Sequence, residues 1–209
     1  MQSKDGRLGF SMVKSLWQAF MFGLTILMLA GCGKPYEFHG TVIPDAQPAP
    51  PITGTNWDGQ AFDLRTLQGK VVIAFFGYTH CPDFCPMTLG NLNKLAEQLG
   101  EKADELAVVL VATDPERDTV EQLAVYMPAF NPAFYGVHVP APALVGVKKS
   151  YGVYAEKNEI DDNPNDDKYF IDHSSYIYVI DKAGDWRLLL PFDTPLEAVR
   201  QDVEYLLGS

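Results

Sequence analysis

The sequence predicts an α/β fold, in which a central mixed β-sheet is flanked by helices. Two continuous apolar runs, Val71–Phe76 and Leu106–Ala112, are typical of strands that are buried on both faces. Between them, leucines recur every three or four residues from Leu89 to Leu99, which indicates an amphipathic helix. The chain ends with two strand-like segments joined by a short turn, followed by a further amphipathic stretch.

The N-terminus has the pattern of an export signal. A basic flank precedes residues 16–30, which are almost entirely apolar but too short for a transmembrane span of about 20 residues. The stretch ends in Leu29-Ala30-Gly31-Cys32, which resembles a bacterial lipoprotein cleavage box. We therefore expect residues 1–31 to be a lipoprotein signal peptide and Cys32 to carry the lipid. The alternative is an uncleaved anchor with an incidental cysteine.

A Gly- and Pro-rich segment follows the signal. We expect residues 32–52 to be a lipid-anchored tether, in which Phe38–Ile43 can add a short strand to the edge of the domain. Residues 53–209 then form the folded domain. The expected location is the bacterial cell membrane, with the domain facing the periplasm or extracytoplasmic side, an oxidising environment. Whether the inner or the outer membrane holds the anchor is left open.

The first half of the domain alternates strands and helices. A helix is expected to start at or just after Cys85, with Pro86 in its first turn, and to end at Gly100. Asp118 or Thr119 can cap the next helix. The expected order is a strand at 71–76, a helix at 85–99, a strand at 106–112 and a helix at 120–129.

The second half ends in a hairpin and a helix. The expected elements are a helix at 142–151, a short strand at 153–155, strands at 174–180 and 186–190, and a helix capped by Thr194 with Pro195 at its first position. The βαβ…ββα order is that of a thioredoxin-like domain with extra N-terminal strands. The active turn of that fold joins a central strand to the next helix, and Cys81 and Cys85 fall there.

Composition limits the classes of function. The 209 residues carry a formal net charge of -11, which argues against binding to nucleic acid or to an anionic lipid surface. One domain of ordinary size is large enough to bury a core without disulfide staples. With Cys32 assigned to the anchor, Cys81 and Cys85 are the two thiols available for chemistry.

The spacing of these two thiols allows two uses. Cysteines four residues apart at the start of a helix can close a disulfide or hold a metal ion, and the helix N-terminus stabilises the thiolate form in either case. Thioredoxin-type oxidoreductases have two residues between their cysteines, whereas this chain has three. Soft thiolates select Cu(I), and imidazole also suits copper.

The chain has four histidines that can supply a third ligand. His39 lies in the tether, His80 precedes Cys81, and His138 is expected at the surface of a proline-rich stretch. His173 directly precedes the strand at 174–180, where thioredoxins place a cis-proline against the cysteine turn. Because no proline lies between residues 166 and 176, His173 is the strongest candidate.

Three motifs together resemble the Sco/SenC family. They are Tyr78-Thr79-His80-Cys81-Pro82-Asp83-Phe84-Cys85-Pro86, Thr113-Asp114-Pro115-Glu116-Arg117-Asp118-Thr119 and Asp172-His173-Ser174-Ser175. The resemblance covers nearly all of residues 53–209. It implies a membrane-anchored copper protein that delivers copper to the dinuclear copper centre of cytochrome c oxidase, or reduces the cysteines of that centre.

By position, the resemblance makes Cys81, Cys85 and His173 the ligands of one copper ion per domain, as Cu(I) or Cu(II). The implied partner is the copper-bearing subunit of cytochrome c oxidase or another copper chaperone. Asp114 and Arg117 can form a cap and turn, or lie near the copper face in supporting or docking roles.

Three further features surround this site. Tyr78 and Phe84 are expected to pack around it, and Asp172 is a supporting candidate next to His173. The acidic segment Glu159–Asp167 is expected to be a solvated loop, with docking as the alternative.

Other functions use the same atoms. A membrane-tethered thiol–disulfide oxidoreductase or thiol peroxidase would use Cys81 and Cys85 as its redox-active pair and would not need His173. A redox or copper sensor is the third alternative. Copper transfer ranks first, and the protein is then not an enzyme in the usual sense.

Overall fold

Two fully buried parallel strands, β4 (Val71–Gly77) and β5 (Leu106–Ala112), form the centre of the structure. Their register pairs Val71 with Leu106 and Gly77 with Ala112. Side chains alternate between the two faces of a strand, so each strand contributes to a hydrophobic cluster on either side of the sheet. This double burial explains why both strands are apolar without a break.

The computed structural model describes residues 35–159 and 169–208 of the chain. The predicted signal peptide, Cys32 and residues 160–167 of the acidic segment lie outside the described residues. The compact unit spans Phe38–Ser209, and residues 35–37 form no helix or strand. Within the described ranges, no helix is both long and apolar enough to cross a membrane.

A mixed eight-stranded sheet surrounds the central pair in the order β1-β10-β9-β4-β5-β6-β2-β3. Strand β6 runs parallel to β5, whereas β9 runs antiparallel to β4. The outer strands are β1 (Thr41–Pro48), β2 (Thr53–Asn56), β3 (Ala61–Asp63), β6 (Tyr135–His138), β9 (Tyr176–Ile180) and β10 (Asp185–Pro191). A separate two-stranded sheet pairs β7 (Ala155–Glu159) with β8 (Tyr169–His173).

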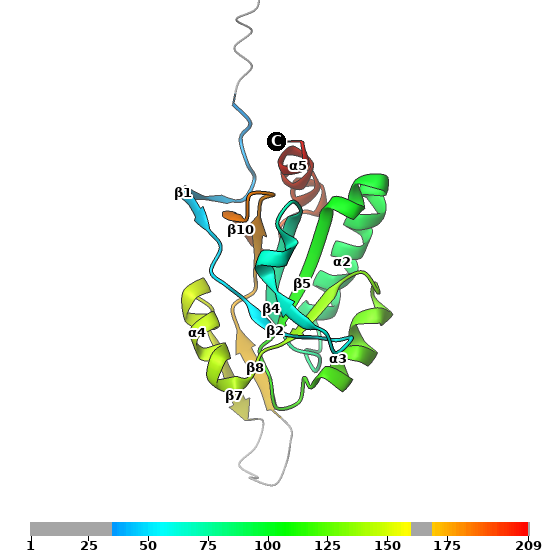
Figure 1. The fold of residues 1–209 in the computed structure, drawn as a ribbon, viewed down its shortest axis with the longest axis vertical. Helices are drawn as coiled ribbons and strands as arrows, with labels where there is room; N and C mark the ends of the chain where they lie inside the picture. The colour runs from blue at the N-terminus through cyan, green and yellow to red at the C-terminus, as the bar shows by residue number, and fades with distance from the viewer. Residues whose placement is uncertain (1–34, 160–168, 209) are drawn as a thin grey trace, which may run out of the picture. The chain divides into compact units, whose positions relative to one another are not determined.

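Helices cover both faces of the large sheet (Figure 1). One face packs against α2 (Phe84–Leu99), α3 (Val120–Tyr126) and α5 (Leu196–Leu207), whose apolar stripes share one cluster. The other face packs against α4 (Ala141–Tyr151). Three short 3-10 helices, η1 (Leu64–Leu67), η2 (Gly100–Glu105) and η3 (Met127–Ala129), complete the described elements.

Most predicted elements are present, with differences at their ends. Thr119 is the N-cap of α3 and accepts a hydrogen bond from the Gln122 amide, as expected for one of the two candidates. The prediction that Thr194 caps α5 is wrong. Pro195 occupies the N-cap position, and the Thr194 amide instead donates to the Pro191 carbonyl in a turn.

Strands β2, β3, β6 and β8 are not among the elements expected from the sequence, and β6 and β8 bear on the site. Strand β6 is short and lies among prolines, and it contains Gly136, whose missing side chain leaves room for Met127. His138, expected at the surface, belongs to this strand and its ring Nδ1 lies 3.0 Å from the Asp118 carbonyl oxygen. The exposed face of strand β8 carries the apolar Phe170 as well as the acidic Asp172, so apolar and polar residues do not alternate along the strand and its inward face is not evident from the sequence.

The N-terminal end of the compact unit is held by a buried carboxylate. Asp202 of α5 is fully buried and accepts hydrogen bonds from the amides of His39 and Gly40 at 3.0–3.1 Å, and its Oδ1 lies 2.9 Å from His39 Nδ1. The edge strand expected at 38–43 follows this contact, but lies at Thr41–Pro48 and pairs with β10. The chain segment before β1 is therefore bonded to the last helix.

Replacing Asp202 by alanine should lower the free energy of unfolding by about 2 kcal/mol, because two backbone amides lose their acceptor near the core. Urea unfolding followed by circular dichroism measures this change. His39→Ala is the matched variant: it keeps both amide bonds and should cost about 0.5–1 kcal/mol. An equal effect of the two variants would show that the amide bonds do not carry the contact.

Candidate metal centre

The two cysteines are placed by the connection from β4 to α2. Cys81 lies in the turn after β4, where its amide donates to the Tyr78 carbonyl, and Cys85 lies in the first turn of α2. Gly77 ends the strand, and a Cβ atom at this position would lie 2.7 Å from Cys85 Sγ. A glycine is required here because any side chain would occupy the space of the sulfur.

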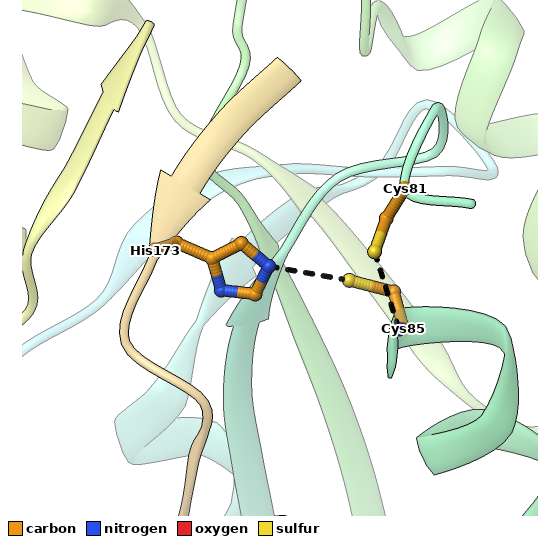
Figure 2. A group of neighbouring side chains, drawn as sticks. All are labelled: Cys81, Cys85 and His173. Carbon is orange, nitrogen blue, oxygen red and sulfur yellow. Dashed lines mark hydrogen bonds between the residues drawn. The ribbon is translucent and has the colours of Figure 1, made fainter. Parts of the chain in front are cut away.

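The sulfur of Cys81 acts as an acceptor for the start of α2. The N-cap residue, Asp83, makes no side-chain capping bond, and the Cys85 amide instead donates to Cys81 Sγ at 3.4 Å (Figure 2). The first amides of a helix have no partner within the helix, and an anion is stabilised there. The helix start therefore favours the thiolate form of Cys81.

The two sulfurs titrate very differently. A hydrogen bond from the Cys85 thiol, together with the backbone amides of Asp83 and Cys85, holds the pKa of Cys81 far below its usual range. The same hydrogen bond and burial raise the pKa of Cys85. At neutral pH the pair is therefore one thiolate and one thiol, and both cysteines are free and buried.

His173 reaches the cysteines from the end of β8. Figure 2 shows its ring pointing toward the two sulfurs, and Nε2 lies 3.7 Å from Cys85 Sγ. The other ring nitrogen, Nδ1, lies 3.0 Å from the Ser174 carbonyl oxygen. A carbonyl oxygen only accepts, so Nδ1 carries the proton and Nε2 presents its lone pair to the sulfurs.

The three donor atoms have a spacing that suits one metal ion. Cys81 Sγ, Cys85 Sγ and a ring nitrogen of His173 all lie within 4.8 Å of one another. Donors at about 2.0–2.3 Å from a shared ion in a trigonal plane lie roughly 3.5–4 Å apart. Shortening the distances between the donor atoms by about 1 Å would bring them to the spacing of such a site. Within the described ranges, no other three His, Cys, Asp or Glu side chains converge in this way.

A groove of about 530 Å³ opens onto this cluster. Tyr78 is buried at its base, and its ring meets the His173 ring edge-on at a centroid distance of 5.7 Å. The exposed side chains of Phe84, Tyr154 and Phe170 contribute to its apolar lining. The lining includes the carboxylates of Asp83 and Asp172 and no lysine or arginine, so its charge favours a cation.

The structure separates the four supporting candidates. Tyr78 contacts His173, as expected of a packing residue. Asp172 is exposed and accepts a hydrogen bond from the Asn158 amide group. Asp114 and Arg117 bond to each other and to Tyr169 of β8.

Two residues near the site were missed by the sequence analysis. Asp118 is fully buried and does not cap α3; its Oδ1 accepts from the amide and hydroxyl of Thr79, which fixes the turn before Cys81. Tyr169 was missed with its strand. The period-two spacing of Tyr169, Ile171 and His173 is the signal that would have revealed Tyr169 and its strand.

Comparison with known proteins agrees with this architecture. Residues 44–208 match the SCO1/SenC family model. A SCO2-like protein of Rickettsia felis is 33% identical over 153 residues, which is 73% of this chain and 72% of that protein.

Solved structures agree as well. Bradyrhizobium japonicum ScoI with copper bound superposes with a TM-score of 0.68 at 31% identity, covering 77% of this chain and 99% of ScoI. Apo Sco1 of Thermus thermophilus gives a TM-score of 0.69 at 31% identity, covering 84% and 98%. The predicted thioredoxin-like α/β fold is thus confirmed, and the chain belongs to the SCO1/SenC family.

Proposed function

We propose that this protein binds one copper ion through Cys81, Cys85 and His173 and transfers it during the assembly of cytochrome c oxidase. The convergence of two sulfurs and one imidazole nitrogen within 4.8 Å carries this proposal. Membership of a family with copper-bound relatives supports the choice of metal.

The donor set favours copper over a structural zinc ion. Structural zinc sites are almost always closed by four ligands, whereas three donors converge here. Two thiolates suit Cu(I), and an imidazole suits either oxidation state of copper. With three protein ligands and an open groove beside them, an incoming ligand of a partner can bind the ion before the protein releases it.

The receiving partner is, in this proposal, the copper-bearing subunit of cytochrome c oxidase or another copper chaperone. A solved Sco protein of similar fold is described as a cytochrome c oxidase assembly protein. Exposed aromatic side chains around the groove, including Phe84 and Phe170, offer an apolar contact for such a partner. We also propose that lipid on Cys32 holds the domain at the membrane, on its extracytoplasmic side, as the N-terminal sequence predicts.

A second function is favoured by the paired thiols. In this alternative, the Cys81 thiolate attacks a partner's disulfide and the Cys85 thiol completes the exchange. The partner gains two electrons and the one proton of the Cys85 thiol, so it leaves as one thiol and one thiolate, and the thiolate takes its proton from water. A Cys81–Cys85 disulfide forms. The low pKa of Cys81 and the free Cys85 beside it support this chemistry. The oxidised pair cannot bind copper, so the two activities would exclude each other at any one moment.

Copper titration of the reduced protein should saturate at one ion per chain. Cys81→Ala and Cys85→Ala should each weaken binding by at least about 100-fold, and His173→Ala by about 10–100-fold, because each removes a direct ligand. Equilibrium competition with a chromophoric chelator measures these affinities.

His80→Ala is the matched control for the histidine variant. His80 neighbours Cys81 in the chain, but its exposed ring lies 3.1 Å from the Thr79 hydroxyl and 3.9 Å from Asp118 Oδ1 and does not belong to the cluster. Copper affinity should be unchanged in this variant. Full affinity in His173→Ala, or a large loss in His80→Ala, would overturn the ligand assignment.

In the copper-free protein, alkylation of Cys81 by iodoacetamide should already be at its plateau rate at pH 7. A free thiol has a pKa of about 8.5 and reacts faster as pH rises to that value, whereas the lowered pKa of Cys81 keeps it ionised. Removing the thiol that donates to it, by Cys85→Ala, should raise the pKa of Cys81 and restore a rise in rate above pH 7.

Mass spectrometry of the Cys81 peptide separates this signal from alkylation at the other cysteines. A wild-type rate that climbs steeply between pH 7 and pH 9 would contradict the thiolate assignment.

A further inference from the structure

We propose that Asp114, Arg117 and Tyr169 form a clamp that positions His173 and thereby sets the ratio of the protein's Cu(II) affinity to its Cu(I) affinity. This inference deepens the proposed function and rests on it. The three residues are positioning residues, because they act on the metal centre only through the strand that bears His173.

The clamp joins the loop after β5 to the start of β8. Arg117 Nε donates to Asp114 Oδ2 at 2.5 Å, and Arg117 Nη1 donates to the Tyr169 carbonyl at 3.1 Å. The guanidinium carbon of Arg117 lies 3.4 Å from the centroid of the Tyr169 ring, and the Tyr169 hydroxyl donates to Asp114 Oδ1 at 2.9 Å. Asp114 is 1% exposed, so these contacts are largely shielded from water.

The strand needs such a clamp because its sheet is isolated. Among the strands of residues 35–159 and 169–208, β7 and β8 pair only with each other and are not part of the eight-stranded sheet. A two-stranded hairpin is marginally stable on its own. The Ser174 amide donates to the Tyr154 carbonyl, and the Tyr154 amide donates to the Ser174 hydroxyl oxygen. These two bonds join the ends of the hairpin to each other and not to the cysteine turn. Side-chain contacts must therefore hold the hairpin against the rest of the domain.

The inward face of β8 connects the clamp to the metal centre. Tyr169, Ile171 and His173 alternate with the exposed Phe170 and Asp172, so they share one face of the strand. Ile171 is 6% exposed and packs in the core at the middle of this face. Tyr169 and His173 lie about 7 Å on either side of it, at roughly 3.3 Å per residue. Releasing Tyr169 would let the strand tilt about Ile171 and move the His173 ring.

The two oxidation states of copper respond differently to such a movement. Two thiolates are soft ligands that hold Cu(I) without help, whereas Cu(II) binding depends more on nitrogen donors. A displaced imidazole therefore weakens Cu(II) binding more than Cu(I) binding. The ratio of the two affinities therefore reports the position of His173. A general loss of stability would weaken the binding of both oxidation states and would leave this ratio unchanged.

The test compares Arg117→Gln and Tyr169→Phe with wild type in the full-length chain. Arg117→Gln removes the charge and the stacking, and Tyr169→Phe removes only the hydroxyl bond to Asp114. Both should lower Cu(II) affinity, by about 10-fold for Arg117→Gln and less for Tyr169→Phe, with Cu(I) affinity kept within about twofold. Competition with Cu(I)- and Cu(II)-selective chelators gives the affinities, and hydrogen exchange of the β7–β8 amides in the copper-free protein reports the loosened hairpin.

Arg187→Gln is the matched control. Arg187 pairs with Asp181 in a partly buried ion pair beyond the far end of β9, away from His173. This variant loses an arginine–aspartate pair of similar kind, and both copper affinities should be unchanged. If Arg117→Gln does not fold, the milder Tyr169→Phe decides the question.

Combining each clamp variant with His173→Ala completes a double-mutant cycle for Cu(II) affinity. Once the ring is absent, loosening the clamp should have no further effect on Cu(II) affinity. Unchanged Cu(II) affinity in both clamp variants, an equal loss for both oxidation states, or a full effect in the His173→Ala background would overturn the clamp. A wild-type protein that binds no copper would instead contradict the proposed function itself.

Discussion

The amide of Cys85 needs an acceptor at the start of α2, and the sulfur of Cys81 supplies it. This contact sets the separation of the two sulfurs and favours a negative charge on one of them. It also requires Cys85 to pack tightly against the end of β4, where only Gly77 leaves enough room. The chemistry of the centre thus follows from a backbone requirement that every helix start has to meet.

The third donor reaches this turn from a distant part of the chain. His173 is 88 residues from Cys85 in sequence and is carried by a small two-stranded sheet that is separate from the main one. The loop after β5 serves both halves of the site. Asp118 fixes the turn before Cys81 through Thr79, while Asp114 and Arg117 hold Tyr169 on the hairpin. One short loop is therefore bonded to both elements that carry the donors.

The parts of the fold that were predictable are those where burial dictates the sequence pattern. Strands β4 and β5 are covered on both faces and are apolar throughout, so they were visible without the structure. Strand β8 has one exposed face with Phe170 and Asp172, and its partner strand is polar, so no comparable run marks it. The role of Asp118 was also unreadable, because Asp118 and Thr119 are equally good caps in sequence and only the fold brings Thr79 within reach.

The unequal protonation of the two sulfurs has a consequence for the stoichiometry of metal loading. Cys81 is already ionised at neutral pH, whereas Cys85 still holds its proton. An ion bound by both sulfurs as thiolates would therefore displace one proton, from Cys85, and not two. Between the two titrations, apparent affinity would fall about tenfold for each unit of acidification. Of the two sulfurs, only Cys85 would then exchange a proton for the ion at neutral pH, so the loading of the two cysteines would be coupled to proton release at a single buried atom.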